Sequence, residues 1–159
     1  MNSRGTLSVS TKNLSQSSSS SSALASIGNG MKSLGLYAEA KPILLDALAL
    51  RRANLPETHS EVWDSEFELG RLEVEGGDGL VAVERCRRLL AVQKKARADR
   101  AVLLNTRFYE GVALISLGLD EGGAALKEVL AERQRFLPRN HKDVILVKLA
   151  LIAWLIDQA

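Results

Sequence analysis

The chain has 159 residues, of which 46% are hydrophobic and 25% charged, values close to those of ordinary globular proteins. Its single cysteine excludes an internal disulfide framework and a cysteine-rich zinc site. Its 21 basic and 19 acidic residues are too evenly balanced to indicate nucleic-acid binding, and no stretch is long and apolar enough to span a membrane. We therefore expect a soluble, cytoplasmic protein, and with only 4% aromatic residues and three prolines it should be helical.

The first 22 residues differ in composition from the rest of the chain. Ten of them are serine, including the unbroken run Ser17 to Ser22, and none is acidic. Such a segment has little apolar surface to offset the entropy cost of ordering, so we predict a disordered tail over residues 1–22. An organelle transit peptide is the alternative, although arginine is scarce for that role. A secretory signal is excluded because no apolar stretch follows Arg4.

From Ala23 onward the sequence repeats itself. A motif Arg-x-x-x-Leu-Pro-x-x-His begins at Arg51 and again at Arg133, 82 residues later. Glycines also occur in pairs seven residues apart, with 42 and then 41 residues between successive pairs. The pairs are Gly28 and Gly35, Gly70 and Gly77, and Gly111 and Gly118. Two independent markers that agree on one period indicate an internal repeat.

Each period predicts a hairpin of two helices, from the apolar 3–4 spacing and the breaks between segments. The first helices are expected over residues 23–34, 61–75 and 101–117, and the second helices over residues 37–53, 80–98 and 120–136. The corresponding repeats span residues 23–60, 61–100 and 101–142. A last helix follows over residues 143–157.

The paired glycines take two different places in these hairpins. Gly35, Gly77 and Gly118 follow the first helices, where a left-handed C-terminal cap favours glycine. The other three, at positions 28, 70 and 111, lie inside the first helices. A glycine inside a helix costs about 1 kcal/mol relative to alanine, so its recurrence indicates close packing between helices.

The first unit carries the most specific motif. Residues 34–42 read Leu-Gly-Leu-Tyr-Ala-Glu-Ala-Lys-Pro, residues 44–52 read Leu-Leu-Asp-Ala-Leu-Ala-Leu-Arg-Arg, and residues 55–59 read Leu-Pro-Glu-Thr-His. This string resembles the tetratricopeptide repeat (TPR) in its 42-residue form, found in kinesin light chains and many bacterial multi-repeat proteins. The later units match less well, with Gly79 in place of an aromatic residue and Gly122-Gly123 in place of Glu-Ala. The resemblance covers about residues 23–159.

The resemblance implies an all-α superhelix of about three antiparallel helix pairs plus a C-terminal helix. It also implies a concave groove, lined by the first helices, that binds a peptide or helix of a protein partner. By that analogy the groove presents Asn29, Lys32, Asp64, Phe67, Arg71, Glu75, Asn105, Phe108 and Val112. For the two phenylalanines, which occupy equivalent places 41 residues apart, packing in the core is the alternative.

The sequence offers little for catalysis, so we expect no enzyme, no cofactor and no metal site. The only histidines, His59 and His141, occupy the same turn of different repeats, where a turn or helix-start role is expected. Cys86 lies on an apolar helix stripe, and neither histidine is placed to activate it. Motifs of phosphate-binding loops, zinc hydrolases and serine hydrolases are absent.

Charge is unevenly distributed between two neighbouring segments. Residues 61–78 carry seven acidic residues and one basic residue, whereas residues 84–100 carry seven basic and two acidic residues. Mutual neutralisation across the hairpin is one interpretation. The other is an acidic groove wall and a basic outer ridge, each attracting a partner of opposite charge.

The predicted last helix is apolar on all sides. Between Val144 and Ile156 only Lys148 is charged. The terminal helix of a solenoid normally has a polar outer face, so this helix predicts an interface through Leu151, Trp154 and Leu155. The partner is either a second copy, in a homodimer, or further repeats of a longer protein of which the chain is a fragment.

The favoured function is a non-enzymatic protein–protein interaction module that binds a partner peptide or helix and self-associates through its last helix. The alternative is a fragment of the sensory or scaffold region of a larger bacterial signalling protein, a kinase or a transcriptional regulator. We expect neither nucleic acid nor a membrane as partner, because the last helix lacks the basic polar face of a membrane-surface helix.

Overall fold

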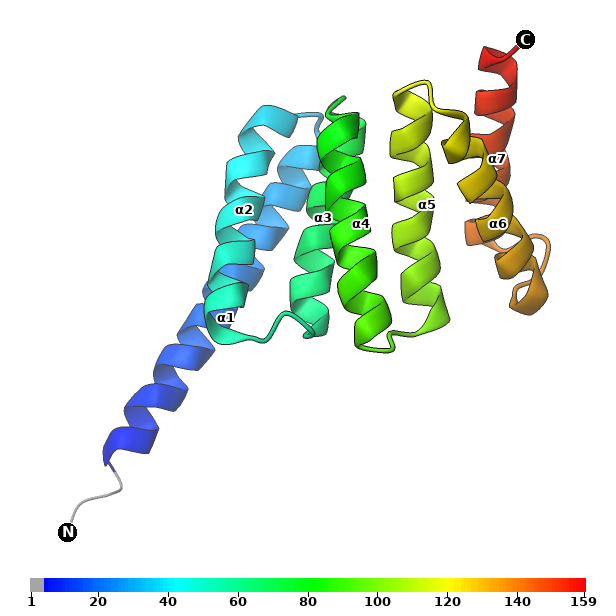
Figure 1. The fold of residues 1–159 in the computed structure, drawn as a ribbon. Coiled ribbons are helices and arrows are strands. Elements are labelled where there is room, and N and C mark those ends of the chain that lie inside the picture. Colours follow the sequence, from blue (N-terminus) through cyan, green and yellow to red (C-terminus); the bar gives the residue numbers. More distant parts are fainter. Residues whose placement is uncertain (1–4) are drawn as a thin grey trace. The chain divides into compact units, whose positions relative to one another are not determined.

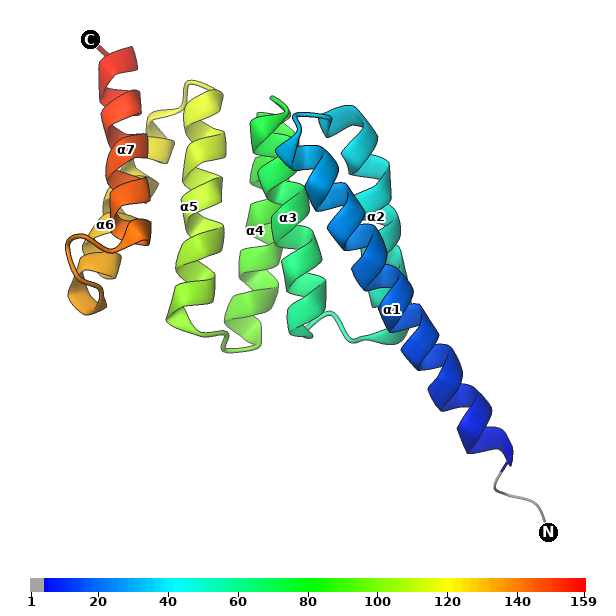
Figure 2. The same ribbon diagram turned by 180° about the vertical axis from the view of Figure 1, so that it is seen from behind.

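The computed structural model describes the backbone of residues 5–159 and the side chains of residues 16–159, and the described residues form seven α-helices (Figures 1 and 2). The helices are α1 (Gly5–Ser33), α2 (Tyr37–Asn54), α3 (Ser60–Glu75), α4 (Gly79–Lys95), α5 (Arg100–Ser116), α6 (Asp120–Phe136) and α7 (Lys142–Asp157). The all-α prediction is confirmed over these residues. From Tyr37 onward, every predicted helix boundary lies within about three residues of the observed one.

The chain divides into two compact units, Met1–Leu72 and Glu73–Ala159, and the division falls in the last turn of α3. In the first unit α1 packs on α2, and α3 contributes to the same core. In the second unit α4 packs on α5, α5 on α6, and α7 on both α6 and α5. The first core consists of Ala40, Leu44, Leu48, Val62, Leu69 and Leu72, and the larger core of the second unit consists of Leu104, Phe108, Leu126, Val129, Val147 and Leu151.

Three glycines close the turns after α1, α3 and α5 in the left-handed conformation. Gly35, Gly77 and Gly118 have φ values of +77°, +88° and +72°. In each turn the residue after the glycine donates its N–H to the carbonyl five residues earlier, as in Leu119 to Leu114 at 3.0 Å. This is the hydrogen-bonding pattern of a Schellman cap, so the predicted role of these glycines is confirmed.

The glycines inside the first helices allow the second helices to approach closely. A Cβ atom at Gly28 would lie 2.6 Å from the Leu44 side chain, and one at Gly111 would lie 2.9 Å from Leu126. Both distances are shorter than real carbon contacts, which confirms the predicted close packing at these two positions. The same applies to Gly123 near the start of α6, where a Cβ atom would lie 2.5 Å from the Trp154 ring.

Helix α1 begins at Gly5, so the structure differs from the disordered tail predicted for residues 1–22; residues 1–4 lie outside the described residues. Figures 1 and 2 show α1 beside α2 and extending past its end. Ser21 is 2% exposed, and Asn54 Nδ2 on α2 donates to Ser17 Oγ at 2.6 Å. Serine hydroxyls also donate to backbone carbonyls of the preceding turn, as in Ser20 to Gln16. Composition alone does not reveal these contacts with α2, which hold the part of α1 around Ser17 and Ser21.

The contrast between Gly28 and Gly30 tests the close approach of α1 and α2. We expect Gly28→Ala to lower the free energy of unfolding by about 1–3 kcal/mol, because the new methyl group overlaps Leu44. A Cβ atom at Gly30 meets nothing within 4 Å, so Gly30→Ala should raise it by about 0.5–1 kcal/mol. Urea unfolding of both variants measures the difference, and equal effects would show that α1 and α2 do not pack in this way.

Candidate binding surfaces

The repeated Arg-x-x-x-Leu-Pro-x-x-His motif fixes the start of the helix that follows it. Arg51 Nη1 donates to the carbonyl oxygen of Glu61 at 2.9 Å, and Arg133 Nη1 donates in the same way to that of Asp143 at 2.8 Å. In each copy the histidine Nδ1 accepts a hydrogen bond, 3.2 Å long, from the backbone N–H two residues later. The predicted helix-start role of the two histidines is therefore confirmed, and the motif is structural.

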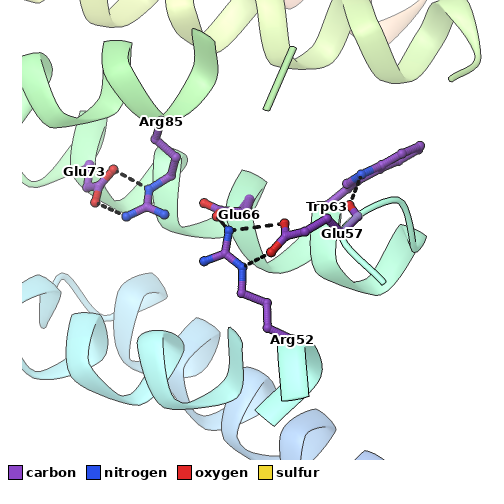
Figure 3. Close-up of polar contacts among 6 residues, drawn as sticks. All are labelled: Arg52, Glu57, Trp63, Glu66, Glu73 and Arg85. Atoms are coloured by element: carbon purple, nitrogen blue, oxygen red, sulfur yellow. Dashed lines mark hydrogen bonds and ion pairs between the residues drawn. The ribbon is translucent and has the colours of Figure 1, made fainter. Parts of the chain in front are cut away.

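Arg52 of α2 pairs with two acidic residues that follow it in the sequence, one in the next loop and one in α3 (Figure 3). Its Nε donates to Glu57 Oε1 at 2.7 Å and its Nη2 to Glu66 Oε1 at 2.6 Å. The backbone carbonyl of Glu57 in turn accepts from Trp63 Nε1 at 2.9 Å, which fixes the loop between α2 and α3. The pKa of the Arg52 guanidinium is raised: desolvation acts against the shift, and the two carboxylates outweigh it.

A second group of charges connects α1 with α3. Lys32, only 6% exposed, donates to Glu68, which also accepts from Arg71 Nη1 at 3.2 Å. Glu61 lies 3.5 Å from the Nε of Arg51. In these contacts the acids are neutralised, as one interpretation expected, by bases of α1, α2 and α3 itself.

One ion pair does cross the hairpin of α3 and α4. Arg85 Nε and Nη2 donate to the two carboxylate oxygens of Glu73 at 2.8 and 2.9 Å, and both residues are buried (Figure 3). On the other side of α4, Arg87 Nε donates at 3.0 Å to Glu110, which also accepts from Arg107. Of the five basic residues of α4, Arg85 and Arg87 are thus paired within the second unit, which reduces their capacity to attract an acidic partner.

Two adjacent hollows lie in the first unit, and Arg51 lines both. The first, of about 330 Å³, is called here the serine hollow; it is lined by Ser17, Ser18, Ser21, Leu50, Arg51, Asn54, Leu55 and Glu61. The second, of about 350 Å³, is called the acidic hollow; it is lined by Ser22, Ala25, Ser26, Asn29, Leu44, Arg51, Asp64, Ser65 and Glu68. Two buried polar atoms of lining residues, Asn29 Oδ1 and Arg51 Nε, make no hydrogen bond.

Asp64 gives the acidic hollow a perturbed carboxyl group. Although its side chain reaches solvent, the surrounding protein removes part of its hydration, and this desolvation raises the pKa of Asp64 above its ordinary value. Glu68 and Glu61 raise it further, while Arg51 opposes the shift. A cation in the hollow would favour the ionised form, so the carboxyl group is placed to attract a basic group.

The outer face of α7 is a continuous apolar surface, called here the α7 face. Six large hydrophobic side chains of this helix are 43–68% exposed: Ile145, Leu146, Leu149, Ile152, Leu155 and Ile156. The opposite face packs on the core through Val144, Val147 and Leu151. None of the helices in the described part of the chain is both long and apolar enough to cross a membrane.

The three residues predicted for this interface are divided between the two faces of α7. Leu151 is 8% exposed and belongs to the core. Contrary to the expectation, it does not lie on the α7 face. Trp154 is half-buried and packs over Gly123, with Lys127 Nζ 5.2 Å from its ring centroid. Leu155, 55% exposed, is the one of the three that lies on the α7 face.

Comparison with solved structures gives independent support for the fold. Two crystal structures of nearly identical TPR-like repeats, from a Podosopora anserina protein named as a kinesin light chain, match with TM-scores of 0.67 and 0.65. Each match is 21% identical and covers 84% of this chain and 64% of the other. The chain has a TPR-like fold. No family model and no curated protein matches it.

Five predicted groove residues lie in the first unit of this TPR-like fold, where the structure places them as follows. Asn29 and Asp64 line the acidic hollow, and Phe67 is half-buried. Lys32 and Arg71 are both bonded to Glu68, so their charges are already engaged within the unit. Their role in binding stays a prediction, for which the acidic hollow is the favoured location.

The other four lie in the second unit, and Phe108 is not on its surface. The Phe108 ring is 4% exposed, with the Arg133 guanidinium 5.5 Å from its centroid, so the alternative of core packing is observed. Val112 is half-buried against the same core. Asn105 is exposed and accepts from Arg133 Nη2 at 2.7 Å, and Glu75 is exposed. The groove role of Glu75, Asn105 and Val112 stays a prediction, whereas Phe108 belongs to the core.

The arrangement of reactive side chains gives little support to catalysis. The described residues contain no group of three or more histidine, cysteine, aspartate or glutamate side chains placed to hold a metal ion. Cys86 is 4% exposed, and a buried thiol in apolar surroundings behaves as a small hydrophobic side chain.

The cap made by His141 is open to a direct test. We expect His141→Ala to lower the free energy of unfolding by about 1 kcal/mol, because the N–H of Asp143 loses its acceptor at the start of α7. His141→Asn keeps a side-chain acceptor and should retain most of that stability. Urea unfolding of the two variants at neutral pH compares them, and an equal loss in both would contradict the capping role.

The raised pKa of Asp64 predicts a dependence of stability on pH. Because the folded protein binds this proton more readily than the unfolded chain, ionisation of Asp64 opposes folding as the pH rises through the ordinary aspartate value of about 3.9 to the raised one. Asp64→Asn should therefore raise the stability at pH 7, by less than about 1 kcal/mol for this solvent-accessible group. The gain should disappear near pH 3, as thermal unfolding at both pH values would show.

Proposed function

We propose that the chain is a non-enzymatic protein–protein interaction module that self-associates through the α7 face. The observation that carries the proposal is the exposure of large apolar side chains there, including Leu149 at 58%, Ile152 at 53% and Ile156 at 68%. With Ile145, these positions follow helical spacings of four, three and four residues, so they form one stripe along the helix. Exposed apolar surface of this kind is typical of protein-binding sites.

A second copy of the chain is the favoured partner of the α7 face. Two such faces are apolar along their whole length and so are complementary to each other, as a two-fold symmetric interface requires. The stripe from Ile145 to Ile156 is about 16 Å long, at a rise of 1.5 Å per residue, and carries no charged residue. Association would remove the stripe from water at no cost in unpaired charge.

A partner peptide or helix is the second element of the proposed function. The TPR-like fold supports it in general terms, and the predicted groove residues that line a hollow, Asn29 and Asp64, support it for the first unit. Because Glu61, Glu66, Glu68 and Glu73 are already in ion pairs, we expect recognition there to rely on shape and apolar contacts more than on net charge. The alternative, a fragment of a larger bacterial signalling protein, stays a prediction of the sequence.

The oligomeric state tests self-association. We expect size-exclusion chromatography with light scattering to show a concentration-dependent dimer for the native chain. The double variant Leu149→Lys/Ile156→Lys should be a monomer over the same concentration range, because it places charges within the stripe. Leu151 is unsuitable for this purpose, since a lysine there would disrupt the core.

The matched control is Leu80→Lys, which changes a side chain that is 63% exposed at the start of α4, in the same unit but away from α7. It should dimerise as the native chain does. A native chain that is monomeric at all concentrations, or a lysine double variant that still dimerises, would contradict self-association through this surface.

A further inference from the structure

The first and third hairpins can be aligned residue by residue from their contacts. Gly28 of α1 packs on Leu44 of α2 as Gly111 of α5 packs on Leu126 of α6. The first helices are therefore offset by 83 residues and the second helices by 82, and the second offset also relates Arg51 to Arg133. The same places in the two units can then be compared directly.

In the second unit, large apolar side chains fill the space between the helices. Leu104 and Phe108 of α5 belong to the core, 9% and 4% exposed, together with Val147 of α7. The equivalent positions in the first unit hold Ser21, Ala25 and Ser65. These smaller side chains line the serine and acidic hollows. The hollows therefore occupy the place that the second unit fills with its own leucine and phenylalanine.

The surroundings of Arg51 indicate the same unfilled space, because Arg51 lacks the aromatic contact that its counterpart Arg133 makes. In the second unit the Arg133 guanidinium lies over the Phe108 ring, 5.5 Å from its centroid, a distance typical of a cation–π contact. In the first unit Arg51 holds the equivalent place, but the position of the phenylalanine is taken by Ala25, which has no ring. The Arg51 guanidinium thus lines both hollows without the aromatic neighbour that its counterpart has.

We infer that the two hollows form a binding site for a partner peptide, which inserts an aromatic side chain beside Ala25 and an aliphatic side chain beside Ser21. The inference rests on the proposed partner-binding function and names the chemistry of that partner. The aromatic ring contacts Arg51, and a lysine or arginine next to it faces the carboxylate of Asp64. Asn29 Oδ1, which makes no hydrogen bond with any residue that the structure describes, accepts from a backbone N–H of the peptide.

The size and division of the site favour side chains over a cofactor. Volumes of about 330 and 350 Å³ are at the lower end of the range of roughly 300–1,000 Å³ for small-molecule pockets. The volume is shared between two hollows that have Arg51 in common, as expected for two anchoring side chains of one segment. The acidic side chains of the lining are Asp64 and Glu68 in the acidic hollow and Glu61 in the serine hollow.

The decisive variant replaces small lining residues of the hollows by the large side chains that the second unit has at the equivalent positions. Ser21→Leu/Ala25→Phe should raise the melting temperature by about 2–4 °C, because it adds buried apolar contacts where the native chain has space. The matched control, Ser20→Leu/Ala23→Phe, adds the same side chains at exposed positions of α1 and should give no such rise.

Binding is measured with acetyl-phenylalanyl-lysinamide as the probe, by titration of backbone amide NMR shifts. In the native chain and in the control we expect shifts at residues 21–29, 51 and 64–68. The filled variant should bind the probe at least about tenfold more weakly, because its own side chains occupy the site. Acetyl-phenylalanyl-glutamic acid α-amide, which carries a side-chain carboxylate, should bind the native chain about threefold more weakly than the lysine probe, owing to Asp64.

Any of three results would overturn the inference. A lower melting temperature for the filled variant would show that the space is not available, and unchanged probe binding by that variant would show that the probe binds elsewhere. Light scattering on the filled variant separates this from the proposed self-association, because its α7 face is unaltered. A filled variant that dimerises while the native chain ignores the probe overturns the hollow site alone.

Discussion

Leu44 and Leu126 each occupy a place that exists only because the facing helix has a glycine there, Gly28 in one hairpin and Gly111 in the other. This close approach determines the distance between the two helices of a hairpin, and with it the size of the space between them. In the second unit that space holds leucine and phenylalanine side chains, whereas in the first unit serine and alanine leave it open. The candidate site is thus a consequence of constant backbone spacing combined with varied side-chain volume.

The connections from α2 to α3 and from α6 to α7 share a second feature, a pair of an arginine and a histidine. An arginine near the end of the second helix donates to a carbonyl at the start of the next helix, and a histidine caps that start. In the first unit the same arginine, Arg51, also lines both hollows, so a residue that orders the turn stands at the candidate binding site. In the second unit its counterpart Arg133 is covered by Phe108, and desolvation lowers the pKa of its guanidinium. The two equivalent arginines thus have the same structural role but different surroundings.

The charged residues of the chain contribute less to recognition than their number suggests. Glu73 and Arg85 neutralise each other in the interior, and Glu66 and Glu68 are paired with bases of α1, α2 and α3. The two candidate surfaces, the α7 face in the second unit and the space beside Ala25 in the first, are mainly apolar. Apolar contacts supply most of the free energy of protein association, while exposed ion pairs supply little.

Apart from the start of α1, the sequence by itself determined the helix positions, the turn glycines and the repeat, because apolar periodicity and glycine conformation are local properties of the chain. It also indicated the close approach at Gly28 and Gly111 and the apolar character of residues 144–156. Only the tertiary structure decided that Phe108 and Leu151 belong to the core, that the acidic residues after Glu61 find bases on other helices, and that Ser21 is buried beside α2. Burial and pairing depend on which helices pack against each other. That packing is determined by contacts between side chains that are far apart in the sequence.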